Sequence, residues 1–352
     1  MEKESEQIHP FGMVNKVRFF KEQFGELTIK HWNLDFKRPA RTSRDVLTQH
    51  HVCYVFLHDS AGSVIARGEI APIIGLSTES WDDVEKAIQS WMNGEFQEIQ
   101  AWPSAVKAAV DMLWQDLFPS SIPKLCLING LVWMNEVEAM FHEAMEKYHQ
   151  GFRCIKLKVG SLDFADELSL IQSLRSRFGS DVVIRLDANG AWKLEEAISK
   201  LEALSQWNIH SIEQPIAANQ WESMRFLSEH SPIPIALDEE LIGREVADID
   251  RILAACQPEY LVIKPSLHGG FDMADEWIRA AQKRGIDWWA TSALESNVGL
   301  SHIYRWLGNY QNDLPQGLGT GHLYTNNWDC PLQLNGQIMG WNAQQSWRAP
   351  WN

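Results

Sequence analysis

The part of the chain that decides the fold runs from residue 154 to residue 265, where five short apolar stretches each end on a charged residue. They read Cys-Ile-Lys-Leu-Lys-Val-Gly (154–160), Ile-Arg-Leu-Asp-Ala-Asn-Gly (184–190), Ser-Ile-Glu-Gln-Pro (211–215), Ile-Ala-Leu-Asp-Glu-Glu (235–240) and Leu-Val-Ile-Lys-Pro (261–265). The charged residues that end the apolar stretches are separated by 29, 26, 25 and 26 positions; they are Lys158, Asp187, Glu213, Asp238 and Lys264. Each interval fits one strand, one helix and two short loops, so the pattern predicts a repeated strand–helix unit.

Parallel strands that are joined in this way close into a barrel, and their carboxyl ends meet on one face. The charged residues should therefore converge, although they are far apart in sequence: Lys158, Asp187, Glu213, Asp238 and Lys264. We predict an α/β fold with a (β/α)7β TIM-like barrel over residues 123–325, closed by strands at 287–292 and 316–319. Residues 1–122 are predicted to form an α+β capping domain, and residues 326–352 a C-terminal segment that packs back on it.

The N-terminal region favours antiparallel strands followed by helices. Residues 17–21, 51–57 and 64–69 have the composition of strands, and Asp59-Ser-Ala-Gly62 is typical of a hairpin turn. From residue 80 to residue 117 the apolar residues recur at helical spacing. We therefore expect a small sheet covered by helices in front of the barrel.

Composition excludes several classes of function. The net charge is −15 and the isoelectric point is about 5.2, so a nucleic-acid partner has no basic surface to bind, and an anionic membrane surface is equally unsuited. No apolar run approaches the roughly 18 residues of a membrane span. The five cysteines are scattered without a CxxC pair, which favours free thiols in a reducing, cytoplasmic setting. Whether the protein is a monomer or a homo-oligomer stays open.

The three predicted strand-end acids suggest a metal site. Asp187, Glu213 and Asp238 offer hard anionic oxygens without histidine or cysteine, a ligand set that selects Mg²⁺, or Mn²⁺, over zinc. The alternative is that each acid only caps the helix that follows its strand. Three acids on successive strands at matching intervals favour the metal.

The lysines suggest acid–base chemistry. Lys156 and Lys158 are two positions apart on a strand and therefore point to the same side. Two neighbouring ammonium groups disfavour one another's charge, which should lower a pKa and allow a lysine to act as a general base. Lys264 would face them from across the barrel. The alternative is that these lysines only neutralise the acids.

Together these motifs resemble the muconate-lactonizing subgroup of the enolase superfamily. The residues that carry the resemblance are Lys156-Leu-Lys158, Asp187-Ala-Asn189, Glu213-Gln-Pro215, Asp238-Glu239, Lys264-Pro265 and Gly68-Glu-Ile-Ala-Pro72. Residues 264–271, 291–299 and 317–321 further resemble the o-succinylbenzoate synthases, which are carbon–oxygen lyases of menaquinone biosynthesis. The resemblance implies metal-dependent dehydration of a small carboxylate, 2-succinyl-6-hydroxy-2,4-cyclohexadiene-1-carboxylate, to o-succinylbenzoate through an enediolate.

The resemblance also implies roles for individual residues. Lys158 would be the base, and Lys264 would stabilise the enediolate from the other side. Ser292 and Gly319 would hold the succinyl carboxylate. Three more residues are expected to contact the substrate or support its surroundings, with the last of them orienting a lysine: Lys156, Asn189 and Glu239.

Alternative functions remain on the same scaffold. N-Succinylamino-acid racemisation is one, and dipeptide epimerisation is another, although Gly317-Leu-Gly319 lacks the Asp-x-Asp with which such epimerases bind an ammonium group. A non-catalytic barrel would usually lack one of the acids or lysines. We further expect His268 to be a solvated loop residue, Arg185 to form an ion pair in the barrel or a weak substrate contact, and residues 24–27 and 38–41 to cap the site.

Overall fold

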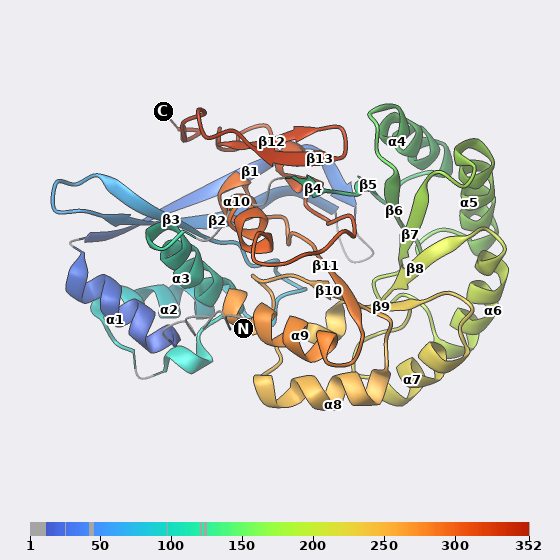
Figure 1. Cartoon of the computed structure of the whole chain (residues 1–352), viewed down its shortest axis with the longest axis horizontal. Helices are drawn as coiled ribbons and strands as arrows, with labels where there is room; N and C mark the ends of the chain where they lie inside the picture. The colour runs from blue at the N-terminus through green and yellow to red at the C-terminus, as the bar shows by residue number, and fades with distance from the viewer. Residues whose placement is uncertain are drawn as a thin grey trace, which may run out of the picture.

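The computed structural model describes residues 12–24, 26–41, 46–96, 98–119, 122 and 125–351. It shows a small N-terminal body beside a larger barrel, with the C-terminal strands lying across the top of the view (Figure 1). The predicted boundary between residues 122 and 123 falls partly outside the described residues, because residue 123 is not among them. The predicted barrel with a capping domain is confirmed as the fold.

The barrel consists of parallel strands with a helix after each. Seven strands form one continuous sheet: β5 (Gly130–Val132), β6 (Cys154–Lys158), β7 (Val183–Asp187), β8 (Ile209–Glu213), β9 (Ile235–Leu237), β10 (Tyr260–Ile263) and β11 (Asp287–Ala290). Residues 316–317 complete the ring, because Gln316 bridges to Ile128 and Gly317 bridges to Thr291, both in parallel. The ring therefore closes at the predicted last strand.

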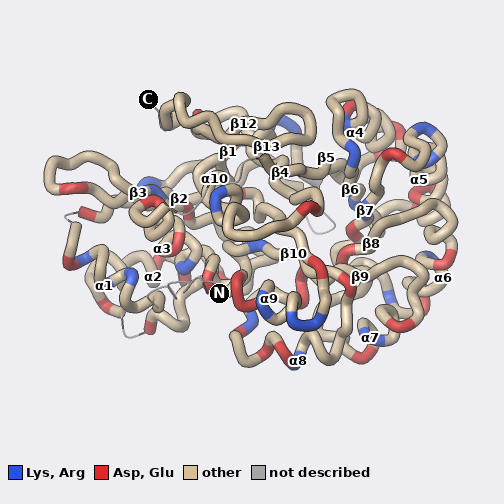
Figure 2. Tube along the Cα trace, in the orientation of Figure 1, with Lys and Arg blue, Asp and Glu red and all other residues tan. Residues whose placement is uncertain are grey.

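The helices lie outside this ring and bury one apolar face against it. They are α4 (Val137–His149), α5 (Phe164–Phe178), α6 (Leu194–Ser205), α7 (Trp221–His230), α8 (Val246–Cys256), α9 (Phe271–Gln282) and α10 (Asn297–Leu307). In α5, for example, Leu170, Leu174 and Phe178 are buried at helical spacing. Acidic and basic residues are interspersed along the outer helices (Figure 2). None of the helices in the described residues is long and apolar enough to cross a membrane.

The capping domain is an antiparallel sheet covered by helices. Its elements are α1 (Met13–Gln23), β1 (Glu26–Arg41), β2 (Val46–His58), β3 (Val64–Ile70), α2 (Trp81–Asn93) and α3 (Ser104–Leu117). The predicted hairpin between β2 and β3 is present, with the carboxylate of Asp59 accepting hydrogen bonds from the amides of Ala61 and Ser63. The Ser80 side chain and Asp83 form a capping box that starts α2.

One predicted strand of this domain is wrong. Residues 17–21 lie in α1, although their composition favours a strand. Val17 and Phe20 are three positions apart and are both buried in the core that α3 also lines. Packing against the rest of the domain therefore outweighs the local strand preference.

The C-terminal segment contacts both bodies. Strands β12 (Leu332–Asn335) and β13 (Ile338–Trp341) form a small antiparallel sheet with β4 (Cys126–Leu127), at the entrance to the barrel. Aromatic side chains of the same segment reach the capping sheet, where the Trp328 ring lies 5.5 Å from that of Tyr54 and the Trp351 ring 5.6 Å. The C-terminal segment thus pairs its strands with the barrel region and packs its aromatic side chains against the capping domain.

A buried ion-pair cluster joins the capping domain to α9. Lys16 of α1 lies 2.7 Å from Asp111 of α3 and 2.8 Å from Asp272 of α9. The other oxygen of Asp111 accepts a hydrogen bond from the amide of Phe271 at 2.8 Å. This approach is possible because Gly270 has no side chain: a Cβ there would lie 2.4 Å from that oxygen, at a φ of +100°.

We expect the Lys16→Met substitution to lower the free energy of unfolding by about 3–5 kcal/mol, because Asp111 would be left buried without a cation. Urea denaturation followed by circular dichroism measures this loss. Arg225→Met is the control, since Arg225 and Glu229 form an exposed pair on α7 that should contribute under about 1 kcal/mol. Equal losses in both variants would contradict the structural role of the cluster.

Candidate active site

The predicted site residues come together at the carboxyl ends of the barrel strands. Lys158, Asp187 and Glu213 occupy matching positions in the pairing of β6 with β7 and of β7 with β8. A cavity of about 310 Å³ opens above them. Six of the predicted site residues line this cavity: Lys156, Lys158, Asn189, Lys264, Ser292 and Gly319.

The three acids do not line the cavity themselves but are buried and paired with lysines that do. Asp187, Glu213 and Asp238 are 0%, 1% and 0% exposed. Lys156 lies 2.7 Å from Asp187 and 2.6 Å from Glu213. Lys264 contacts Asp238 from the opposite side. Each of the three acids is thus within ion-pair distance of a buried lysine.

None of the three acids caps the helix that follows its strand. The N-cap residues of α6, α7 and α8 are Lys193, Gln220 and Glu245. Asp238 is the N-cap residue of the 3-10 turn Glu239–Leu241, but its side chain makes no capping hydrogen bond there. The alternative that these side chains serve as helix caps is therefore wrong.

Asn189 connects Lys158 to Glu239. The Lys158 ammonium group lies 2.7 Å from Asp187 and donates to the Asn189 carbonyl oxygen at 2.7 Å. The Asn189 amide nitrogen donates to Glu239 at 3.1 Å. Asn189 adopts a φ of +45°, a conformation that asparagine tolerates better than most residues, and its backbone amide is held by Asp187. Glu239 is therefore connected to Lys158 through hydrogen bonds of Asn189.

The lysine pKa values differ from the expectation for Lys156. Burial lowers the pKa of Lys156, but attraction by Asp187 and Glu213 outweighs burial and raises the pKa above its ordinary value. Burial likewise lowers the pKa of Lys264, and Asp238 more than offsets it. The expected lowering by a neighbouring ammonium group is thus wrong for Lys156, because the carboxylates are closer partners than Lys158.

The acids divide into two kinds. Burial alone would raise the pKa of Asp187, but Lys156 and Lys158 outweigh burial and lower it. The pKa of Glu213 is raised by burial and further by the charge of Asp187. The lowered pKa keeps Asp187 ionised, whereas Glu213 depends on additional positive charge to remain ionised.

The donor set fits a divalent cation. Within the described residues, Glu213 Oε1 and Asp238 Oδ1 are buried and have no hydrogen-bond partner. Buried carboxylate oxygens without a donor are costly, and a hard cation would satisfy both. Asp187, Glu213 and Asp238 are candidates by the chemistry of their oxygens, although among the described residues no three acidic, histidine or cysteine side chains are gathered around one ion position.

The remaining arc of the barrel is uncharged. The Ser292 and Thr320 hydroxyl groups are hydrogen-bonded to each other, and Gly319 lies beside them. Asn129 and Thr291 also line the cavity, although the sequence did not single them out. Their only signal in the sequence is a polar residue at the end of the first or the seventh barrel strand. Such uncharged residues do not form the regular series of charges that marks the other strand ends.

Apolar residues from the capping domain form the roof. Leu47 and residues 73–76 line the cavity from above. Phe24, Glu26 and Leu27 instead line a separate hollow near α1, so the prediction that residues 24–27 cap the site is wrong for these three, and residue 25 lies outside the described residues. The end of β1 is closer, because Ala40 pairs with Leu47.

Two further expectations are corrected by burial. His268 is 1% exposed rather than solvated, and its ring nitrogen accepts from the backbone amide of Lys264 at 3.3 Å. Arg185 forms no ion pair with a carboxylate of the described residues. Its guanidinium carbon lies 3.9 Å from the centre of the Trp289 ring, and the guanidinium group donates a hydrogen bond to the Pro315 carbonyl. Arg185 is therefore a packing residue inside the barrel.

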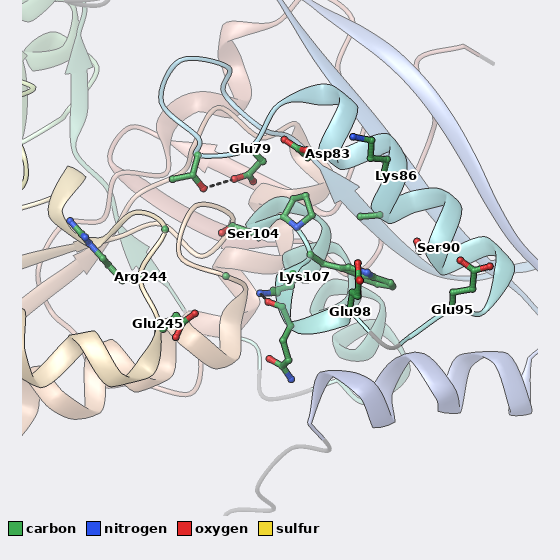
Figure 3. A pocket seen from close by; sticks show the side chains of 18 residues that line it. Glu79, Asp83, Lys86, Ser90, Glu95, Glu98, Ser104, Lys107, Arg244 and Glu245 are labelled. Atoms are coloured by element: carbon green, nitrogen blue, oxygen red, sulfur yellow. Dashed lines mark hydrogen bonds between the residues drawn. The ribbon is translucent and has the colours of Figure 1, made fainter.

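A larger cavity, of about 720 Å³, lies away from this chemistry. It opens between α2, α3 and the loop before α8, where Glu79, Lys107 and Glu245 project into it (Figure 3). None of the predicted site residues lines it. Volume alone would therefore select the wrong cavity as the active site.

Comparison with known proteins identifies the class of protein that has this barrel, this capping domain and these charged strand ends. Residues 139–332, more than half of the chain, match the family model described as Enolase C-terminal domain-like. The chain belongs to this family and thus to the enolase superfamily. It is an enzyme acting on a small molecule, and enzymes of this superfamily generally depend on a divalent metal.

Individual proteins of this superfamily are similar to the chain over most of its length. A protein of Desulfotalea psychrophila named o-succinylbenzoate synthase is 38% identical over 90% of this chain and 98% of its own length. The crystal structure of MenC from that organism matches with a TM-score of 0.76 and 34% identity, over 90% of this chain and 99% of that one. The L-Ala-D/L-Glu epimerase of Bacillus subtilis is 25% identical over 78% of this chain and 82% of its own.

We expect a divalent metal to stabilise the folded protein by about 2.7 kcal/mol at one hundred times its dissociation constant. Asp238→Asn should lose most of this increment, because it removes one of the three buried carboxylates. Asp275→Asn is the control, since Asp275 is bonded to Trp306 and Tyr310 outside the site. Thermal unfolding with and without metal, after exhaustive chelation, measures the increment. A full increment in Asp238→Asn would place the metal elsewhere.

Proposed function

We propose that the protein dehydrates 2-succinyl-6-hydroxy-2,4-cyclohexadiene-1-carboxylate to o-succinylbenzoate, as a step of menaquinone biosynthesis. The observation that carries proton abstraction next to a carboxylate is the placement of Lys158 and Lys264. They come from β6 and from the end of β10, four strands apart in the ring and therefore on opposite sides of one cavity. The identity to the Desulfotalea psychrophila protein over nearly the whole chain supports this substrate.

The chain's residues divide the reaction between them. Lys158 would take the proton from the carbon next to the substrate carboxylate. Negative charge then develops on the carboxylate, where Lys264 would stabilise it from the other side. Loss of the ring hydroxyl group follows, and the proton held by Lys158 would leave with it as water. The product ring is aromatic, so the elimination is strongly downhill.

Asp187, Glu213 and Asp238 would hold Mg²⁺, with Mn²⁺ as a substitute, because their oxygens are hard ligands. The ion would supply positive charge beside the substrate carboxylate and thereby make the adjacent C–H bond more acidic. Asn189 and Glu239 would keep Lys158 aimed at that carbon. The apolar roof would exclude water and strengthen each of these charge interactions.

Racemisation of an N-succinylamino acid is the second candidate. Two lysines on opposite sides of a cavity can each exchange a proton with one face of a carbon, which favours this reaction equally well. Dipeptides are less suited, because Gly317 and Gly319 place no carboxylate at the last strand to bind an ammonium group.

We also propose that the chain divides at residues 122/123 and 325/326 and acts in the cytoplasm. Separate apolar cores in the capping domain and the barrel support the first division. All five cysteines are free, which fits a reducing compartment.

Lys158→Ala should lower kcat for dehydration by at least about 10²–10⁴-fold, because the proton would lose its acceptor. The rise of the aromatic product's absorbance, with Mg²⁺ present, measures the rate. Circular dichroism confirms that the variant is folded. Activity like that of the wild type would overturn the assignment of the base, and faster turnover of N-succinylamino acids by the wild type would overturn the substrate.

Lys264→Arg should retain more dehydration activity than Lys264→Ala, because a cation opposite the base is all that an electrostatic role requires. A racemase would lose proton exchange on one face in both variants. The measurement is kcat for each variant on the dehydration substrate, together with exchange of the α-proton in deuterated water. Equal and complete loss in both folded variants would contradict the electrostatic role.

A further inference from the structure

A second cavity adjoins the active site through a shared wall. It has a volume of about 410 Å³ and lies between α4 and the 3-10 turn at Gly319–Leu323. The two cavities have five lining residues in common: Asn129, Leu131, Trp133, Gly319 and Thr320. This side pocket therefore meets the active site at its uncharged arc, away from Asp187, Glu213 and Asp238.

Lys147 places a cation in the side pocket. Its aliphatic stem crosses β5 at Gly130, where a Cβ would lie 3.1 Å from two of the stem carbons. Its ammonium group lies 5.6 Å from the centre of the Phe152 ring. Within the described residues no carboxylate lies within 4.0 Å of that ammonium group. Glu143, four positions earlier on α4, also lines the pocket; burial raises the pKa of Glu143, and attraction by Lys147 opposes that rise. The missing side chain of Gly130 thus leaves room for the stem of this lysine in the side pocket, which Lys147 lines together with Gly130 and Phe152.

Other cations lie close by. His322 also lines the pocket, and its pKa is lowered by burial and by the positive charges of Lys37 of the capping domain and Lys147. Arg38 lies near enough to Glu143 to attract it. The whole chain carries a net charge of −15, so it repels anions at long range. A local group of cations beside the site is therefore a departure from the overall charge.

We propose that Lys147, supported by Lys37, makes this side pocket a cationic site for the second carboxylate of a two-headed dianionic ligand. One carboxylate of the ligand lies at the charged arc, between Lys158 and Lys264. The other points across the uncharged arc toward Lys147, which attracts it through space. This inference rests on the proposed function, because the proposed substrate and product are both dianions.

The test compares a dianion with a matched monoanion. o-Succinylbenzoate carries the second carboxylate, whereas 2-butanoylbenzoate has a methyl group in its place. Lys147→Met keeps the aliphatic stem on Gly130 and removes the charge. We expect it to weaken binding of o-succinylbenzoate about 3–10-fold and binding of 2-butanoylbenzoate less than 2-fold, because the attraction scales with ligand charge. Titration calorimetry of the Mg²⁺-loaded enzyme measures both affinities.

Two further variants separate charge from packing. Lys147→Arg should bind o-succinylbenzoate as the wild type does, and the wild-type affinity should fall more steeply with added salt than that of Lys147→Met. Lys200→Met is the control, because Lys200 also lies over an aromatic ring, 5.6 Å from Phe164, but lines neither cavity. It should leave both affinities unchanged.

Equal weakening of both ligands in Lys147→Met, with wild-type turnover chemistry intact, would overturn the side-pocket inference alone. Equal loss in Lys147→Arg and Lys147→Met would also overturn it, since packing rather than charge would then be the cause. A wild-type enzyme that neither forms nor binds o-succinylbenzoate would overturn the proposed function and this inference together.

Discussion

The structure depends on a balance of buried charge at the carboxyl ends of five successive strands. Lys156 lies between Asp187 and Glu213, and Lys264 meets Asp238. Burying any one of these groups alone would be costly, so each needs the strand that carries its partner to end at the same level. The pairing of Lys158, Asp187 and Glu213 in adjacent register meets this requirement. The barrel is thus the frame that brings these charges into contact.

The capping domain completes this environment from above. Its apolar residues cover the cavity, and buried polar contacts hold it to the barrel helices. Glu69 of β3 accepts hydrogen bonds from the amides of Ser296 and Gly299 at the start of α10, and burial raises its pKa to about 7. Lys16 makes a second connection to α9 through Asp111 and Asp272. The loop that carries Ser292 is therefore fixed between two domains rather than supported by the barrel alone.

The barrel mouth is divided into two chemically different arcs. Strands β6 to β10 supply the lysines and acids, whereas β11, residues 316–320 and Asn129 supply neutral polar groups. A substrate with a reacting carboxylate at one end and a second polar group at the other matches this division. The same division explains why the charged arc is suited to proton transfer and the neutral arc to recognition.

The sequence by itself determined the barrel and most of the charged arc. The intervals between Lys158, Asp187, Glu213, Asp238 and Lys264 are local properties of a strand–helix unit, and parallel strands must align their carboxyl ends. Charged residues at the ends of apolar strands are also easy to recognise. For these reasons the spacing predicted which side chains would meet.

Tertiary structure alone decided the remainder. Residues 17–21 form a helix because Val17 and Phe20 are buried in a core that distant elements complete. His268 is buried by a loop that folds back on Lys264, and the pKa of Lys156 is raised by acids 31 and 57 positions away. The roof residues near Leu47 and the neutral contribution of Asn129 carry no local signal. Burial and long-range electrostatics depend on what packs against a residue, and a single sequence does not state that.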